Sequence, residues 1–184
     1  MISLYHGSLS DFDTIDLSKC KDSRDFGRGF YLSSDIEHAE SFAQSRRRKL
    51  ERIYRLRHID RKIVEYRYNF TFDDENAEKS LKVRKFDSAN SEWLRFVVEN
   101  RTSDVLKSDY DIVIGPTADA AAYSIIMDSA EDLIRSDYDK SICEEIIHEL
   151  HPERLSGQYC FCSQESLSYL AFATPEKVVI DEQI

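Results

Sequence analysis

The feature that most constrains the fold is an alternating stretch at residues 62–72, KIVEYRYNFTF. In an extended chain, successive side chains point to opposite faces. One face of this stretch would then be apolar and aromatic, with Val64, Tyr66, Tyr68, Phe70 and Phe72. The other face would be polar, with Glu65, Arg67, Asn69 and Thr71. This pattern predicts a half-buried strand, and hence a sheet that is covered on one face.

Shorter signals predict the remaining elements. Apolar runs bounded by glycine, proline or polar residues predict strands at 2–6, 30–33, 110–115, 158–163 and 177–182. A Ser-x-x-Glu capping box at 34–37 predicts a helix that starts at about Asp35, and periodicity predicts helices at 91–101, 119–135 and 138–150, with a brief one at 163–170. Strands and helices mix without regular alternation, so we predict one α+β domain over residues 1–184 with a mostly antiparallel sheet.

The composition limits where the protein is expected to be found and which groups it is expected to bind. No apolar run approaches the roughly 18 residues of a membrane span, and the N-terminus lacks the features of a secretory signal. The four cysteines form no CxxC pair or zinc-like spacing, and the five histidines form no helical ligand pair. We therefore expect reduced thiols, no metal site, no membrane association and a cytoplasmic location.

The charge is unevenly distributed. The chain carries a net charge of −10, but residues 46–62 hold nine basic residues against Glu51 and Asp60. This segment, with its net +7, leaves −17 for the rest of the chain. The segment could be a solvated helix face, or a patch for phosphates or for an acidic partner protein.

The stretch DFGRGFYLS, residues 25–33, places two of the five glycines around an arginine and directly before an aromatic pair. It could be a tight turn whose tyrosine enters the core. It could also be a ligand cradle, because glycine lets the backbone approach a ligand closely and an aromatic ring offers a stacking surface. A polar loop of about 18 residues precedes it, and loops of that length often bind ligands.

Three separated pieces, LYHGS, GRGFYLSSDIEHA and QYCF, together resemble the ADP-ribosyltransferase superfamily. The resemblance is to the branch with a His…Tyr…third-residue signature, which includes poly-ADP-ribose polymerases and diphtheria-type toxins. The chain is also similar to a poorly characterised bacterial family of such proteins, through blocks that span residues 4–170. The resemblance implies a split antiparallel sheet with flanking helices, and NAD as co-substrate.

Cleavage of the nicotinamide–ribose bond mainly requires orientation of the dinucleotide and stabilisation of a developing cation. The resemblance implies that His6 bonds the adenosine ribose, that the Gly7 backbone pairs with the nicotinamide carboxamide, and that Tyr31 stacks on the nicotinamide ring. It also places further residues at the dinucleotide, with the arginine near the pyrophosphate: Ser8, Gly27, Arg28 and Gly29.

The chain departs from the family at the third signature position, where Gln158 stands in place of the usual glutamate. An amide can bond a ribose hydroxyl but supplies no full negative charge to stabilise the cation. The acid could come from elsewhere, and we favour Glu92 over Asp119 and Glu165 as that acid. Asn100 and Arg101 lie about two turns beyond Glu92 and could line the same cleft.

We therefore expect an NAD-dependent mono-ADP-ribosyltransferase that modifies a protein or nucleic acid. The resemblance implies the toxin of a bacterial toxin–antitoxin pair, with a small neutralising protein as partner. Two alternatives stay open: a catalytically inactive module of the same fold that binds NAD, another nucleotide or a partner, and an enzyme like the RNA 2′-phosphotransferases.

Overall fold

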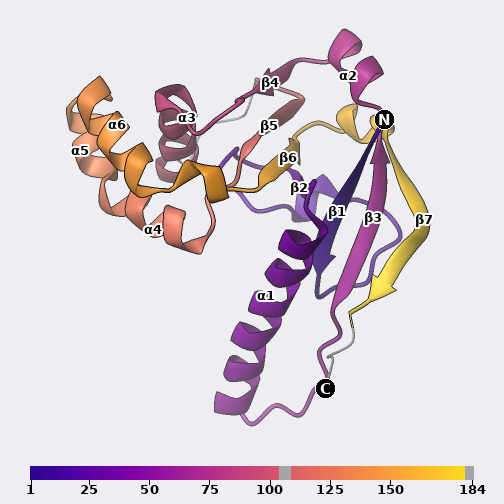
Figure 1. Cartoon of the computed structure of the whole chain (residues 1–184). Helices are drawn as coiled ribbons and strands as arrows, with labels where there is room; N and C mark the ends of the chain where they lie inside the picture. Colours follow the sequence, from indigo (N-terminus) through magenta and orange to yellow (C-terminus); the bar gives the residue numbers. More distant parts are fainter. Residues whose placement is uncertain (104–108, 181–184) are drawn as a thin grey trace.

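The computed structural model describes residues 1–103 and 109–180. Over these residues one seven-stranded sheet forms the centre, in the order β4-β5-β6-β2-β1-β3-β7 (Figure 1). The β4–β5 pair is parallel and every other pair is antiparallel, which confirms the mixed α+β class. The strands are β1 Ile2–Ser8, β2 Phe30–Ser33, β3 Tyr66–Phe72, β4 Val83–Lys85, β5 Ile112–Pro116, β6 Gly157–Phe161 and β7 Leu170–Val179.

Most of the helices begin at an acidic or amide side chain that accepts hydrogen bonds from the first turn, as N-caps do. These caps are Asp35, Asp73, Asn90, Asp119 and Asp139. None of the described helices is both long enough and apolar enough to cross a bilayer. The helices are α1 Ile36–Leu56, α2 Asp74–Ser80, α3 Ser91–Thr102, α4 Ala120–Asp128, α5 Ala130–Arg135 and α6 Lys140–Glu149, with three short 3₁₀ turns, η1 Leu17–Lys19, η2 Pro152–Arg154 and η3 Ser166–Tyr169.

The sheet separates two hydrophobic cores. The first lies between one face of the sheet and helices α3–α6, which gather on one side of the molecule (Figure 1), and its largest member is the fully buried Trp93. The second lies on the other face around Phe30, Phe70 and Phe161, and the segment between β1 and β2 covers it through partly buried apolar residues, including Phe12. The long polar loop of the sequence therefore packs on the sheet.

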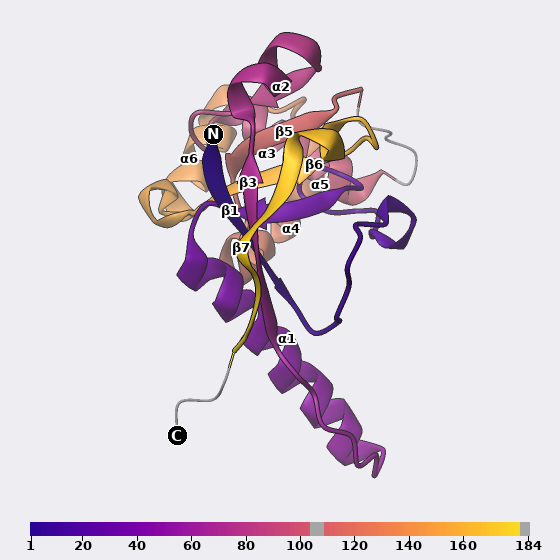
Figure 2. The same cartoon turned by 90° about the vertical axis from the view of Figure 1, so that its right-hand side faces the viewer.

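Helix α1 crosses β1 at close range because Gly7 has no side chain. A Cβ atom built at Gly7 would collide with the carbonyl oxygen of Ala39 and would lie 3.2 Å from the Cβ of Ala43. Only these two residues of α1 are buried, and both belong to its first half. The second half of the helix projects away from the body (Figures 1 and 2).

The structure confirms most of the predicted elements and moves several boundaries. The predicted strand at 62–72 begins only at Tyr66, and just before it the buried Glu65 carboxylate accepts a 2.8 Å bond from Arg47 of α1. The cap of α1 is Asp35, one residue after the predicted Ser34. The predicted helix at 119–135 is two helices, which Ser129 separates.

One helix and one strand were missed, and another strand is longer than expected. Helix α2 and strand β4 have seven and three residues, which is too short for a clear periodic signal. Strand β7 begins at Leu170 rather than at 177, because it continues the pairing of β3 from Phe72 onward. The end of the predicted last strand, 181–182, lies outside the described residues.

Candidate functional site

The three residues of the His…Tyr…third-residue pattern lie on three neighbouring strands. His6 is on β1, Tyr31 on β2 and Gln158 on β6, and the sheet order places β2 between the other two. Strands β2 and β6 pair along their length, but β1 and β2 share only one register pair, Tyr5 with Ser33. The sheet therefore brings distant parts of the sequence together where its hydrogen-bond ladder is interrupted.

His6 bridges this interruption through its side chain. Its Nδ1 atom lies 2.8 Å from the carbonyl oxygen of Tyr31. Because a carbonyl only accepts, Nδ1 carries the proton and Nε2 is left as an acceptor. The imidazole packs against Phe30, with ring centroids 4.6 Å apart, and meets Phe12 edge-on at 6.0 Å.

Burial lowers the pKa of His6 from 6.5 to about 4, against the hydrogen bond to Tyr31, which raises it. The unfolded chain then binds more protons than the folded chain between these two values, so stability falls as the pH drops through this window. The His6→Asn variant keeps a side-chain donor but has no group that titrates in this window. Between pH 7 and pH 4 we expect the free energy of unfolding to fall by up to about 3 kcal/mol less in this variant than in the wild type. Urea unfolding across this range measures the difference, and parallel curves would contradict it.

Tyr31 points to the opposite face of the sheet from His6. Its register partner is Cys160, and its ring packs against the core under α3–α6. Its hydroxyl donates to the carbonyl of Gly27 at 2.7 Å and accepts from the amide of Phe26 at 3.0 Å. Burial raises the pKa of this hydroxyl far above its usual range, so it stays a neutral donor that holds the glycine loop.

The other residues that the resemblance placed at the dinucleotide have roles within the protein. Gly27 has φ +78° and faces Asn100, whose Oδ1 atom would lie 2.7 Å from an added Cβ. The Arg28 guanidinium donates to the carbonyls of Leu17 and Ser18 and so ties β2 to the loop before it. Gly29 packs against Cys160 and Phe161, and the Ser8 hydroxyl donates to Ser10.

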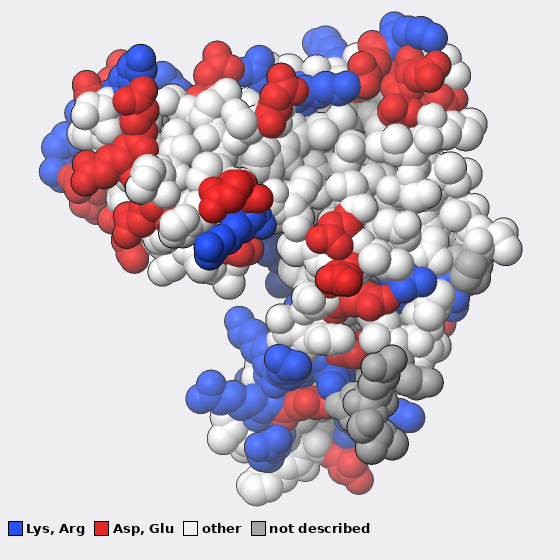
Figure 3. Space-filling view, viewed as in Figure 1, with Lys and Arg blue, Asp and Glu red and all other residues white. Residues whose placement is uncertain are grey.

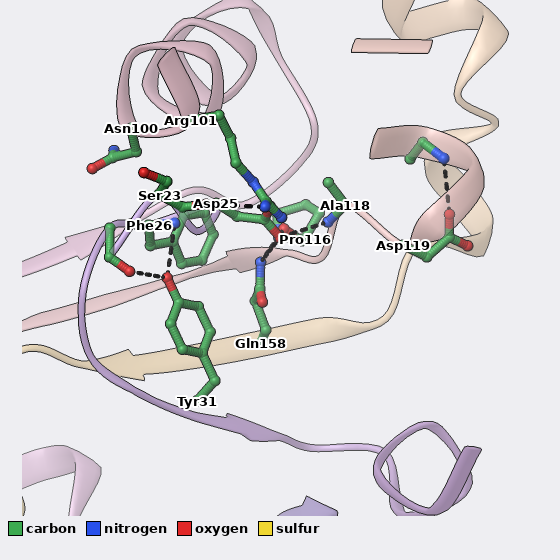
Figure 4. A network of polar contacts seen from close by, with 12 residues as sticks. Ser23, Asp25, Phe26, Tyr31, Asn100, Arg101, Pro116, Ala118, Asp119 and Gln158 are labelled. Atoms are coloured by element: carbon green, nitrogen blue, oxygen red, sulfur yellow. Dashed lines mark hydrogen bonds and ion pairs between the residues drawn. The ribbon is translucent and has the colours of Figure 1, made fainter. Parts of the chain in front are cut away.

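Asp25 is the centre of a buried polar network that sequence reasoning missed (Figure 4). It is 5 % exposed. Its Oδ1 atom accepts from Arg101 at 2.9 Å and 2.5 Å, and its Oδ2 atom accepts from Gln158 at 3.0 Å and from the amide of Ala118 at 3.2 Å. The carboxylate therefore joins the start of the glycine loop to the end of α3 and the start of β6.

Gln158 is buried beside this carboxylate, with 7 % exposure. Its Nε2 group donates to Asp25 and, at 3.3 Å, to the carbonyl of Pro116, which also accepts from the indole of Trp93 at 2.9 Å. Both neighbours only accept, which fixes the orientation of the amide. A negative charge thus lies next to the third signature position, but it belongs to Asp25.

Glu92 does not join this cluster. Its carboxylate pairs with Arg84 at 2.7 Å and is 73 % exposed. It lines a surface hollow of about 240 Å³, whose lining includes none of the signature residues. Arg101, which contacts Asp25, is nine residues after Glu92 on α3. The two positions are therefore about 13 Å apart along the helix axis.

The other two candidate acids are also placed apart. Asp119 caps α4 by accepting from the amides of Ala121 and Ala122. Glu165 is exposed beside η3. Of the residues considered around the cleft, the structure thus brings Asn100 and Arg101 to the glycine loop and Asp25, and Glu92, Asp119 and Glu165 do not reach them.

The described residues hold no group of three or more His, Cys, Asp or Glu side chains placed to bind a metal ion. All four cysteines are unbridged, and the sulfur atoms of Cys160 and Cys162 are 3.4 Å apart. Burial raises the pKa of Cys160 well above its usual range, which keeps it a thiol next to Tyr31. Its side chain is fully buried in the core under α3–α6.

Comparison with protein-family models matches residues 2–172 to a family described as a protein of unknown function, DUF3990. The match covers most of the chain, so the chain belongs to this family. Comparison with curated proteins gives no match, and comparison with solved structures gives none either.

Proposed function

We propose that this chain is an NAD-dependent mono-ADP-ribosyltransferase that modifies a macromolecule. The observation that supports this most is the adjacency of the strands that carry His6, Tyr31 and Gln158, where β1 and β2 share a single register pair. His6 and Tyr31 face opposite sides of the sheet, and the His6 ring bridges the break through the Tyr31 carbonyl, so in this proposal binding of a dinucleotide to both residues opens that bond.

In this proposal the residues have separate tasks. The Nε2 atom of His6 accepts a hydrogen bond from a ribose hydroxyl, and the Tyr31 ring stacks on nicotinamide. Gln158 bonds the second ribose through its amide oxygen, since its Nε2 group is already used. The carboxylate of Asp25, behind Gln158, supplies the negative charge that stabilises the developing cation.

A second candidate is a module of the same fold that binds NAD without cleaving it. Arg101 supports it, because this guanidinium contacts Asp25 through two nitrogens and neutralises the charge that the chemistry would need. A binding-only protein would keep the strands, the loop and the buried network.

The experiment is to incubate the purified chain with NAD labelled on the adenylate and with a cell lysate. We expect label to enter macromolecules, and digestion with nuclease and protease in separate samples to identify the acceptor class. Calorimetry with NAD and measurement of released nicotinamide follow binding and cleavage separately. Binding without release would select the second candidate, and neither binding nor transfer would refute both.

Paired variants at Tyr31 test the role of its ring. Tyr31→Phe keeps the aromatic surface and loses the bonds to Gly27 and Phe26, whereas Tyr31→Leu removes the stacking surface but keeps an apolar side chain. We expect Tyr31→Phe to keep at least about a third of the affinity for NAD and Tyr31→Leu to lose about tenfold. Equal losses in two variants of equal thermal stability would contradict a stacking role.

A further inference from the structure

The second half of α1, with the turn that follows it, forms a surface that the proposed transfer reaction does not use. We call residues 46–62 the basic arm. It projects from the body (Figure 2), and its lysines and arginines form a basic cluster at the end of the molecule, with acidic side chains next to the cluster on the side of the body (Figure 3). The arm has a net charge of +7, and the rest of the chain has −17.

The body leaves most of this charge unpaired. Arg47 is the exception, because it pairs with Glu51 at 3.0 Å and with Glu65 at 2.8 Å. Four other basic residues of the arm are exposed and form no ion pair with any residue that the structure describes. They are Arg48, Lys49, Arg52 and Arg55. Unpaired guanidinium groups in a row attract an anionic partner.

The arm also exposes large apolar side chains. Ile53 is 36 % exposed, Leu56 is 72 % exposed and Ile59 is 44 % exposed. On α1, Ile53 and Leu56 lie three residues apart, about 40° and about 100° around the helix axis from the buried Ala39, and Ile59 follows in the turn after the helix. An apolar strip between basic residues is therefore free for contact with a second helix.

We infer that the basic arm docks an acidic amphipathic helix of another protein. The apolar strip distinguishes this partner from a nucleic acid, whose phosphates would contact the arginines and leave Ile53, Leu56 and Ile59 in water. Like charges disfavour the arm of a second copy as the occupant. A helix with leucines along one side and glutamates beside them matches both the strip and the charge.

The test uses a labelled synthetic peptide of about three heptads, with leucine at the a and d positions and glutamate at e and g. Fluorescence anisotropy at about 0.15 M salt, where the screening length is about 8 Å, measures its binding to the full chain. We expect saturable binding that Ile53→Ser with Leu56→Ser weakens at least tenfold. Ile134→Ser, on α5 and 51 % exposed, is the matched control and should leave the affinity within twofold.

Three further measurements decide against the other occupants. A labelled single-stranded oligonucleotide and vesicles with anionic lipid are titrated in the same buffer, and sedimentation reports self-association. Tighter binding of the oligonucleotide or the vesicles, or a dimer that the serine variant dissolves, would overturn the inference. Peptide binding that the serine variant leaves intact would also overturn it. None of these readouts involves NAD, so they are independent of the transfer reaction.

Discussion

Replacing Asp25 with alanine is expected to lower the free energy of unfolding by about 3–5 kcal/mol. The change would leave the Arg101 guanidinium, whose side chain is only 15 % exposed, without its carboxylate. It would also remove the acceptor of the Gln158 amide and of the Ala118 amide. Each buried donor without a partner adds to the loss. Urea unfolding followed by circular dichroism gives the value.

Asp119→Ala is the matched control, because it also removes one carboxylate that accepts from backbone amides. Asp119 caps an exposed helix end, so its loss should cost about 1 kcal/mol. Asp25→Asn keeps the shape of the side chain and one acceptor, so its loss of unfolding free energy should lie between those of Asp25→Ala and Asp119→Ala. A loss for Asp25→Ala no larger than that of the control would mean that the network contributes little to stability.

Gln158→Glu, the change toward the family pattern, is expected to destabilise the fold by about 2–4 kcal/mol. The new carboxyl group would replace a donor that lies 3.0 Å from Asp25 and 3.3 Å from the carbonyl of Pro116. Two carboxylates at this distance do not both ionise without a large cost. The destabilisation should therefore shrink at acidic pH, where one carboxyl takes up a proton and can donate to the other.

A second substitution tests this reason directly. Asp25→Asn combined with Gln158→Glu exchanges the amide and the acid and restores one donor and one carboxylate between them. The double variant should be more stable than Gln158→Glu alone by about 1–3 kcal/mol, a coupling that a double-mutant cycle measures. Additive effects would show that repulsion from Asp25 is not the cause.

Much of the fold could be predicted from the sequence because its signals are local. The alternation at 62–72 predicted a strand that the structure confirms from Tyr66 onward, the run at 30–33 predicted β2, and the periodicity at 91–101 predicted α3. The errors in the prediction occur where contacts between distant residues determine the local structure. Glu65, predicted on the polar face of the strand, is instead buried, and its carboxylate accepts a bond from Arg47 of α1.

The site was predictable only in part. The strand signals and the resemblance together identified residues that the sheet places on neighbouring strands. Asp25 was not identified, because its partners Arg101 and Gln158 are 76 and 133 positions away and no spacing rule connects them. One weak signal was present, since Asp25 opens the block that contains both glycines. Glu92, the acid favoured from the sequence, lies at the start of α3 and pairs there with Arg84 of β4.

The strand order has a consequence for how the chain is made. Strands β1, β2 and β3 all emerge from the ribosome within the first 72 residues, but the free edge of β2 must wait for β6 at Gly157–Phe161. Until then Phe30 and Leu32, both buried in the finished protein, lack part of their cover. Sheets that join distant segments fold slowly and are prone to mispairing while incomplete. The nascent protein therefore keeps the centre of its sheet incomplete until β6 has been translated.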